Sequence, residues 1–257
     1  MTKHLGFHNK FKKACIATKI ISNWPLIIVD KLGIKKKFYY RIRNTNIKLC
    51  CRSKSSDINE AVVIFTGEEY PIKHINLENN AIVIDLGGNI GLFSIYLLHN
   101  NPLKNIRIIT LEPFEKNTLI LQENIRINNI TQIKIIQKAC TDIDGTVNID
   151  TSVRPDAIFV SRTGNKNVES IKLSSLAKQE NLPTIDLLKM DIEGSEYDIF
   201  EEDYAFIRDN VKKIIMEYHN ISEDKNYKYI AKKISNDFLI EHIYDAYSAG
   251  VLVATRK

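Results

Sequence analysis

Short apolar runs alternate with amphipathic stretches along this chain from about Ala81 onward. The runs have the length of buried strands, whereas Gly91–His99 and Glu115–Asn128 are typical of helices. Strands separated by helices predict crossover connections and therefore a mostly parallel sheet. The strand candidates are Ala81–Leu86, Ile106–Leu111, Ile133–Ala139, Ile185–Met190, Lys213–Tyr218, Phe238–Tyr244 and Val251–Thr255.

The last two strand candidates break this alternation. Only Asp245–Gly250 separate them, and so short a connection suits an antiparallel hairpin. We therefore predict an α/β fold with a doubly wound, mostly parallel sheet of seven strands that ends in an antiparallel C-terminal hairpin.

The first part of the chain follows a different pattern. Lys3–Gly33 predicts one or two helices divided near Pro25, because proline interrupts the hydrogen bonds of a helix. Phe38–Cys51 predicts a strand pair, and Asn59–Thr66 predicts a short helix. The expected units are a helical and β appendage over residues 1–70, packed on the main sheet, and a main domain over residues 71–257.

The charge of the chain is unevenly distributed. Residues 1–54 carry fourteen Lys or Arg and a single acid, Asp30, whereas the remaining 203 residues have a net charge of −8. A strongly basic segment can contact a polyanion or an anionic membrane surface. The alternative is a solvated basic face that contacts nothing.

The overall composition is that of an ordinary globular protein, with 257 residues, 44% of them hydrophobic and 26% charged. The most apolar stretch, Cys15–Ile34, contains Lys19, Pro25 and Asp30, so we expect neither a membrane span nor a secretory signal. A vicinal pair of cysteines, Cys50 and Cys51, and two scattered ones, Cys15 and Cys140, predict a reducing compartment and hence a cytoplasmic protein. The basic N-terminus leaves peripheral contact with the inner face of the membrane as an option.

The most informative motif follows the first core strand. Asp85 ends an apolar run and is followed by Gly87, Gly88, Asn89 and Gly91, a glycine-rich turn that leads into a helix. Glycines let the backbone approach a ligand closely, and open α/β sheets bind ligands at the carboxyl ends of their strands. An acidic Asp85 would repel phosphate and organise contacts to an ammonium group. The alternative is a plain strand-to-helix turn capped by Asn89.

A nicotinamide dinucleotide is a poorer match to this turn. Its fingerprint requires a glycine where the chain has Leu86, so an NAD-dependent dehydrogenase is the weakest enzyme hypothesis.

The next two strands also end in candidate binding residues. Glu112, followed by Pro113, is placed to accept hydrogen bonds from the two hydroxyls of a ribose, although it could simply cap the next helix. Asp142 follows the third strand, where an adenine would lie, but a plain turn around Asp144 and Gly145 explains the same residues.

These motifs together resemble the class I S-adenosylmethionine-dependent methyltransferases, and within them the FkbM family. The resemblance implies transfer of a methyl group from S-adenosylmethionine to oxygen, commonly a hydroxyl of a sugar, glycan or related natural product. It also implies that Tyr70 belongs to the cofactor-binding residues; one departure is Gly88, where the family usually has alanine. The resemblance rests on these stretches: 83–91, Leu111–Pro113 with Glu123 and Asn124, 186–196, Glu217–His219, and Glu69 with Tyr70.

The fourth and fifth strands end in a second group of polar residues. Lys189, Asp191 and Glu193 alternate, so they point to one side if the segment stays extended. Glu217 and His219 share one side of the next strand. If these strands are neighbours, both groups converge, and Asp191 or His219 could take the proton of an acceptor hydroxyl. We expect the catalytic residues to be Asp191, His219, Lys189 and Glu193.

Two alternatives apply to this second group. Asp191, Glu217 and His219 could bind a divalent cation that activates the acceptor oxygen. The residues could instead be structural, with Lys189 paired to a carboxylate and Glu196 favouring the start of a helix.

Other functions remain as hypotheses. The basic N-terminus favours an RNA methyltransferase, but an Asn/Asp-Pro-Pro-Tyr/Phe segment is absent from the sequence and nucleic acid is not the expected partner. A non-catalytic protein that keeps the fold is a further alternative, against which the set of Asp85, Glu112 and Asp191 argues.

Overall fold

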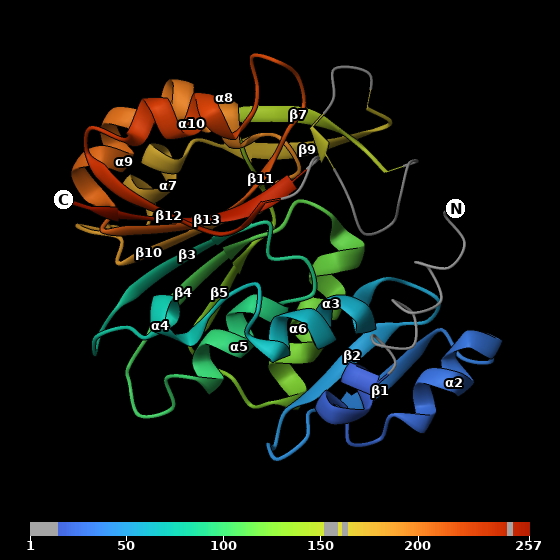
Figure 1. Cartoon of the computed structure of the whole chain (residues 1–257). Coiled ribbons are helices and arrows are strands. Elements are labelled where there is room, and N and C mark those ends of the chain that lie inside the picture. The colour runs from blue at the N-terminus through green and yellow to red at the C-terminus, as the bar shows by residue number, and fades with distance from the viewer. Residues whose placement is uncertain (1–14, 152–158, 161–163, 246–248) are drawn as a thin grey trace, which may run out of the picture.

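The computed structural model contains the predicted seven-stranded sheet (Figure 1). It describes residues 15–151, 159–160, 164–245 and 249–257. The strand order is β12-β13-β11-β10-β3-β4-β5, parallel from β11 to β5, with β12 and β13 antiparallel at one edge. The strands are β3 (Ile82–Leu86), β4 (Arg107–Leu111), β5 (Ile133–Ile136), β10 (Leu187–Met190), β11 (Lys213–His219), β12 (Phe238–Asp245) and β13 (Ala249–Arg256).

Helices cover both faces of this sheet, as expected for a doubly wound fold (Figure 1). The central strands are therefore buried on both sides, which is why they appear in the sequence as continuous apolar runs. One face carries α4 (Ile72–Ile75), α5 (Leu92–His99) and α6 (Glu115–Ile127). The other carries α7 (Leu173–Gln179), α8 (Glu196–Glu202), α9 (Tyr204–Asn210) and α10 (Tyr227–Ile234).

The N-terminal segment packs on α5 and α6. Its β1 and β2 form an antiparallel pair, and the Asn124 side chain of α6 both accepts a hydrogen bond from the backbone of Cys50 (2.6 Å) and donates one to it (3.2 Å). One apolar cluster continues from Leu49 through Ile95 to Val83 of the sheet. The elements are α2 (Pro25–Leu32), β1 (Lys37–Arg41), β2 (Lys48–Arg52) and α3 (Asp57–Thr66).

A second, four-stranded sheet was not expected from the sequence. Its order is β6-β9-β7-β8, with β6 (Ala139–Cys140), β7 (Gly145–Asp150), β8 (Phe159–Val160) and β9 (Lys166–Ile171). The predicted strand Ile133–Ala139 is confirmed over Ile133–Ile136, but it ends there and Ala139 belongs to another strand. The backbone N–H of Lys138 donates to the carbonyl of Ile136 (2.9 Å), and this tight turn sends Ala139 into the second sheet.

Within the described ranges, the structure contains no helix that is both long enough and apolar enough to cross a bilayer.

Candidate active site

The glycine-rich turn after β3 brings two strand ends into close contact. The N–H groups of Gly87 and Gly88 both donate to the carbonyl of Leu111 at the end of β4 (3.0 and 2.9 Å). Gly87 has φ 76°, and a Cβ there would lie 1.8 Å from the carbonyl oxygen of Asp191. Only glycine fits this position, because both the conformation and the close approach exclude a side chain. A Cβ at Gly88 would lie 2.0 Å from Oγ1 of Thr110, so the glycine found there matches the neighbouring threonine.

Asp85 and Lys189 form a buried ion pair beneath this turn. Their charged atoms lie 3.2 Å apart, and the side chains are 0% and 3% exposed. Ser94 donates to the other carboxylate oxygen of Asp85 (2.7 Å), and Lys189 donates to the carbonyl of Gly87 (2.9 Å). Burial disfavours the charge of Lys189, but Asp85 and Asp191 outweigh it and raise the pKa of the ammonium group. Asp85 lines neither cavity described below; its carboxylate contacts Lys189 and Ser94, and its part in organising contacts to an ammonium group stays a prediction.

Glu112 and Pro113 line the first of two cavities at the carboxyl ends of the strands. This cavity has a volume of about 70 Å³ and extends from Gly87 to Ala139 and Cys140 of the second sheet. The carboxylate of Glu112 accepts from the backbone of Asn89 (2.9 Å) and Phe114 (3.0 Å) and from the side chain of Asn117 (3.1 Å). A carboxylate offers about four acceptor sites, so these bonds orient Glu112 and leave capacity for a ligand hydroxyl.

A second cavity of about 320 Å³ adjoins the first along Gly87, Asn89, Asp191 and Glu193. It is rich in carboxylates and aromatic rings. Its other polar and aromatic lining residues include Glu60, Glu69, Tyr70, Phe93, Lys189, Glu217 and Tyr244.

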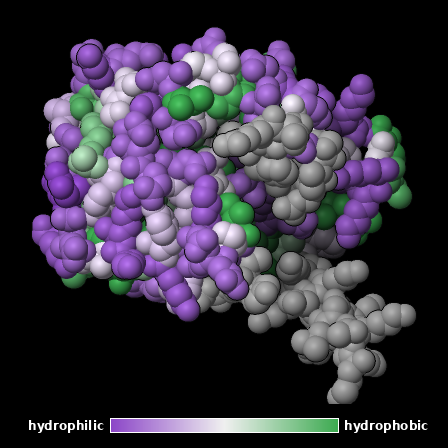
Figure 2. Space-filling view, turned by 90° about the horizontal axis from the view of Figure 1, so that it is seen from above, coloured by the Kyte–Doolittle hydropathy of each residue, from purple (hydrophilic) through white to green (hydrophobic). Residues whose placement is uncertain are grey.

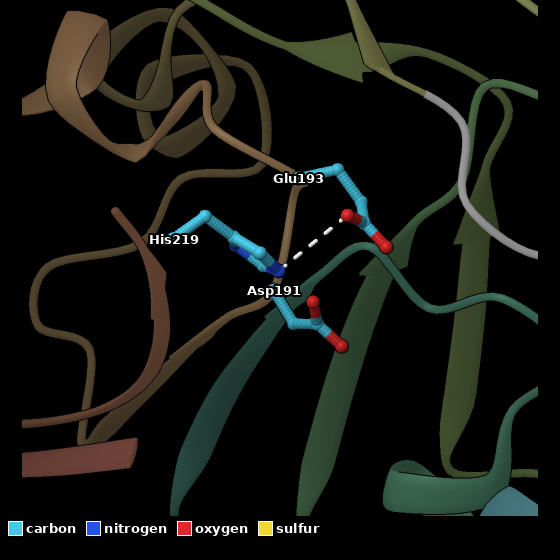
Figure 3. Close-up of side chains that lie close together, drawn as sticks. All are labelled: Asp191, Glu193 and His219. Atoms are coloured by element: carbon cyan, nitrogen blue, oxygen red, sulfur yellow. Dashed lines mark ion pairs between the residues drawn. The ribbon is translucent and has the colours of Figure 1, made fainter. Parts of the chain in front are cut away.

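Three of the predicted catalytic residues lie close together beside the two cavities: Asp191 and Glu193 line both cavities, and His219 lies behind them and lines neither. Asp191, Glu193 and His219 point toward one another from the segment after β10 and the end of β11 (Figure 3). Nε2 of His219 lies 3.4 Å from Glu193 and 4.0 Å from Glu217. The parallel pairing of β10 and β11 brings these residues together, as the sequence predicted for neighbouring strands.

The reason given for this convergence was nevertheless wrong. β10 ends at Met190, and Glu193 has φ 53° in a turn, so the segment does not stay extended. Gly194, with φ 104°, completes the turn into α8. The turn places Asp191 and Glu193 against both cavities, whereas Lys189 lines only the second.

Glu196 orients His219, a role that the sequence did not reveal. Its carboxylate is 0% exposed and lies 3.4 Å from Nδ1 of His219. The same oxygen accepts from the backbone of Ile192 (3.1 Å). Burial alone would lower the pKa of His219, but Glu196, Glu193 and Asp191 outweigh it and raise this pKa to about 9. Nδ1 therefore faces Glu196, and Nε2 faces Glu193, which lines both cavities.

Burial and mutual repulsion disfavour the charged forms of the carboxylates in this region. Burial, and next the charges of Asp191 and Glu69, raise the pKa of Glu217 to about 8. Burial also raises the pKa of Asp191, against the opposing charges of Lys189 and His219. Glu217 is thus a carboxyl group that titrates near neutral pH.

The remaining predicted residues lie in different places. Tyr70 lines the second cavity and packs edge-on against Phe93, with ring centroids 4.9 Å apart. Gly91, with φ 87°, caps the start of α5. Asp142 is exposed and lines neither cavity, and its contact with an adenine stays a prediction.

The structure changes the predicted metal ligands. Among the described residues, ligand atoms of Asp191, Glu193 and His219 lie within 4.8 Å of one another, so Glu193 takes the place expected for Glu217. Two carboxylates and an imidazole are suitable donors for a divalent cation, but a histidine with a raised pKa must first lose its proton.

Comparison with known proteins agrees with this geometry. A family model described as "Methyltransferase FkbM domain" matches residues 85–245, from Asp85 to the end of β12. "Methyltransferase sdnD" of Sordaria araneosa is 26% identical over 187 residues, which cover 58% of this chain and 71% of that protein. "Methyltransferase 1" of Beauveria bassiana is 24% identical over 161 residues, which cover 52% of this chain and 64% of that protein.

A solved structure described as methyltransferase FkbM from Methylobacillus flagellatus KT shares the fold, with a TM-score of 0.52 at 16% identity. The match covers 69% of this chain and 44% of that protein, so this chain corresponds to less than half of the solved structure. A methyltransferase from Agrobacterium tumefaciens superposes with the same TM-score of 0.52 at 8% identity, over 87% of this chain and 71% of that one.

Proposed function

Because this chain belongs to the FkbM family of S-adenosylmethionine-dependent methyltransferases, we propose that it methylates a hydroxyl group of a carbohydrate or related natural product. The observation that carries this proposal is the cluster of Asp191, Glu193 and His219, of which Asp191 and Glu193 line both cavities. The first cavity, with a volume of about 70 Å³, suits the ribose end of the cofactor, since Glu112 can still accept a hydrogen bond there. The second cavity suits the acceptor.

The side chains beside the cavities can remove the hydroxyl proton. Bound S-adenosylmethionine supplies an electrophilic methyl group, and the electrons of its carbon–sulfur bond stay on sulfur when the carbon–oxygen bond forms. The acceptor hydroxyl is a weak nucleophile, so a group that takes its proton during attack accelerates transfer. Neutral His219, deprotonated Glu217 or Asp191 can take this proton, and Glu196 holds the imidazole in orientation.

The lining of the second cavity supports a neutral, hydroxyl-bearing acceptor. The carboxylates of Glu69 and Glu217 accept hydrogen bonds from hydroxyl groups, while the rings of Tyr70, Phe93 and Tyr244 offer apolar surface. In their charged forms the same carboxylates repel phosphates, which argues against an RNA acceptor.

Transfer of labelled methyl groups tests the proposal. We expect tritium from labelled S-adenosylmethionine to enter fractionated glycans or glycolipids and to resist mild base, as an ether does. Label that appears only in RNA would contradict the carbohydrate assignment.

Removing the carboxylate of Glu112 should weaken cofactor binding. We expect Glu112→Ala to bind S-adenosylhomocysteine at least tenfold more weakly, about 1.4 kcal/mol, and to remain folded. Titration calorimetry measures this effect. Glu115→Ala is the control, since that side chain is 63% exposed at the start of α6. Equal affinity in the Glu112 and Glu115 variants would show that Glu112 does not hold the cofactor.

The raised pKa values predict opposite pH dependences for stability and activity. Folding raises the pKa of Glu217 from 4.5 to about 8 and that of His219 from 6.5 to about 9. Each group binds its proton more tightly when folded, so its contribution to stability is complete below the lower value and is lost as pH rises through the higher one. We expect the Tm of the ligand-free protein to fall from about pH 5 to about pH 9.

The rate of methyl transfer should instead rise over the upper part of this range, because a base must be deprotonated. Thermal unfolding and kcat measured in the same buffers check both trends. Glu217→Gln and His219→Gln should each flatten the stability curve; an unchanged curve in both would contradict these assignments.

A further inference from the structure

The short helix α2 exposes three large apolar side chains, Ile28, Val29 and Leu32, to solvent. Its one buried residue is polar: Asp30 accepts hydrogen bonds from Tyr40 (3.0 Å), Ser53 (2.5 Å) and the backbone of Lys54 (3.1 Å). These bonds anchor the helix through its polar residue. Leu26 and Ile27 pack partly on the apolar core, whereas Ile28, Val29 and Leu32 face outward.

Large apolar side chains form an exposed patch on and beside this helix. Ile28, Leu32 and Ile34 are 58%, 68% and 69% exposed, and Trp24 at the start of the helix is 38% exposed. Figure 2 shows hydrophobic side chains at the right edge of the molecule, the side on which Figure 1 shows α2. We call Trp24, Ile28, Val29, Leu32 and Ile34 the α2 patch. A contiguous exposed patch of this kind is typical of a binding surface.

Positive charge surrounds the α2 patch. Lys31, Lys35 and Lys36 are exposed, and none of them makes an ion pair with another residue in the described part of the chain. Arg41 and Lys48 line an open groove of about 830 Å³ that also includes Leu26 of α2. The partner of this surface must therefore combine an apolar layer with negative charge.

We propose that the α2 patch docks on an anionic lipid bilayer, with its apolar side chains at the boundary of headgroups and acyl chains. A helix with apolar side chains on one side and lysines beside them binds such an interface both by burying apolar area and by electrostatic attraction to anionic lipids. A second copy of this chain fits less well, because pairing two α2 patches would bring their lysines together. The basic residues of the first 54 positions add to the attraction.

The fluorescence of Trp24 tests this docking directly, because it is the only tryptophan in the chain. We expect its emission to shift to shorter wavelength, and the protein to sediment, with phosphatidylglycerol vesicles but not with pure phosphatidylcholine vesicles. Ile28→Ser/Leu32→Ser should weaken partition at least tenfold. Lys31→Gln/Lys35→Gln/Lys36→Gln should weaken it and reduce its dependence on salt. Leu103→Ser, at a leucine 97% exposed outside the patch, is the matched control and should bind normally.

Several outcomes would overturn the proposal. These are absence of any shift or sedimentation at low salt, equal binding to neutral vesicles, and unchanged binding of the Ile28→Ser/Leu32→Ser variant. If sedimentation velocity shows a dimer of the unchanged protein and a monomer of this variant, the patch binds a second copy of the chain instead. Calorimetry with S-adenosylhomocysteine verifies that each variant is folded, since the substituted side chains are exposed and lie outside both cavities.

Discussion

Replacing Asp191 or His219 by alanine is expected to lower kcat by about 10²–10⁴-fold while the affinity for S-adenosylhomocysteine changes little. Ligand atoms of the two side chains lie within 4.8 Å of one another, and His219 lines neither cavity, so its loss should fall on proton removal and not on cofactor binding. Asp191 lines both cavities, so its variant must also retain cofactor affinity for the loss to be assigned to proton removal. Single-turnover kinetics and calorimetry separate the two effects.

Matched variants test whether the loss of activity is specific to Asp191 and His219. His99→Ala removes an exposed histidine at the end of α5, and Asp198→Ala removes an aspartate 43% exposed on α8; both should keep full activity. Asp191→Asn preserves volume but cannot take a proton, so it separates charge from shape. Full activity in both alanine variants would contradict the assignment and point to Glu217.

Glu196→Gln tests the positioning of His219. The amide retains the size of the carboxyl group but removes the charge that faces Nδ1. We expect kcat to begin rising at a lower pH in this variant, because Glu196 is the main group that raises the pKa of His219. A chelator that abolishes activity, with restoration by magnesium or manganese, would assign the Asp191, Glu193 and His219 cluster to a metal instead.

Replacing Lys189 by methionine is expected to lower the free energy of unfolding by about 3–5 kcal/mol. The substitution leaves the carboxylate of Asp85, which is 0% exposed, without its counter-charge. Removing one partner of a buried ion pair costs this much because the remaining charge stays out of water. Chemical denaturation monitored by circular dichroism measures the change.

Two further variants test whether the unpaired charge of Asp85 causes the loss of stability. Lys138→Met breaks an ion pair with Glu169 whose side chains are 30% and 65% exposed, and should cost only about 0–1 kcal/mol. Asp85→Asn/Lys189→Met removes the unpaired charge and should recover part of the loss. A Lys189→Met protein as stable as the Lys138→Met protein would show that the buried pair contributes little.

The sequence by itself determined the main sheet and the positions of its functional motifs. Central parallel strands are buried on both faces, so each of them appears as a continuous apolar run, and the short Asp245–Gly250 connection allows only a local hairpin. Asp85, Glu112 and Asp191 could be assigned to strand ends because each directly follows such a run. Local patterns of this kind do not depend on contacts with distant residues.

Only the tertiary structure decided what these residues contact. Polar strands such as β7 and β9 are half exposed and lack an apolar run, so the second sheet was not predicted. The part of the first cavity that this sheet lines was therefore not predicted either. Glu196 lies beside His219 only because a turn with positive φ at Glu193 and Gly194 reverses the chain after β10. Asp85 was assigned to a strand end, and pairing of β3 with β10 buries it against Lys189. Spacing along a sequence indicates which strand end carries a side chain, but the packing of neighbouring strands and turns decides whether that side chain faces a cavity or an opposite charge.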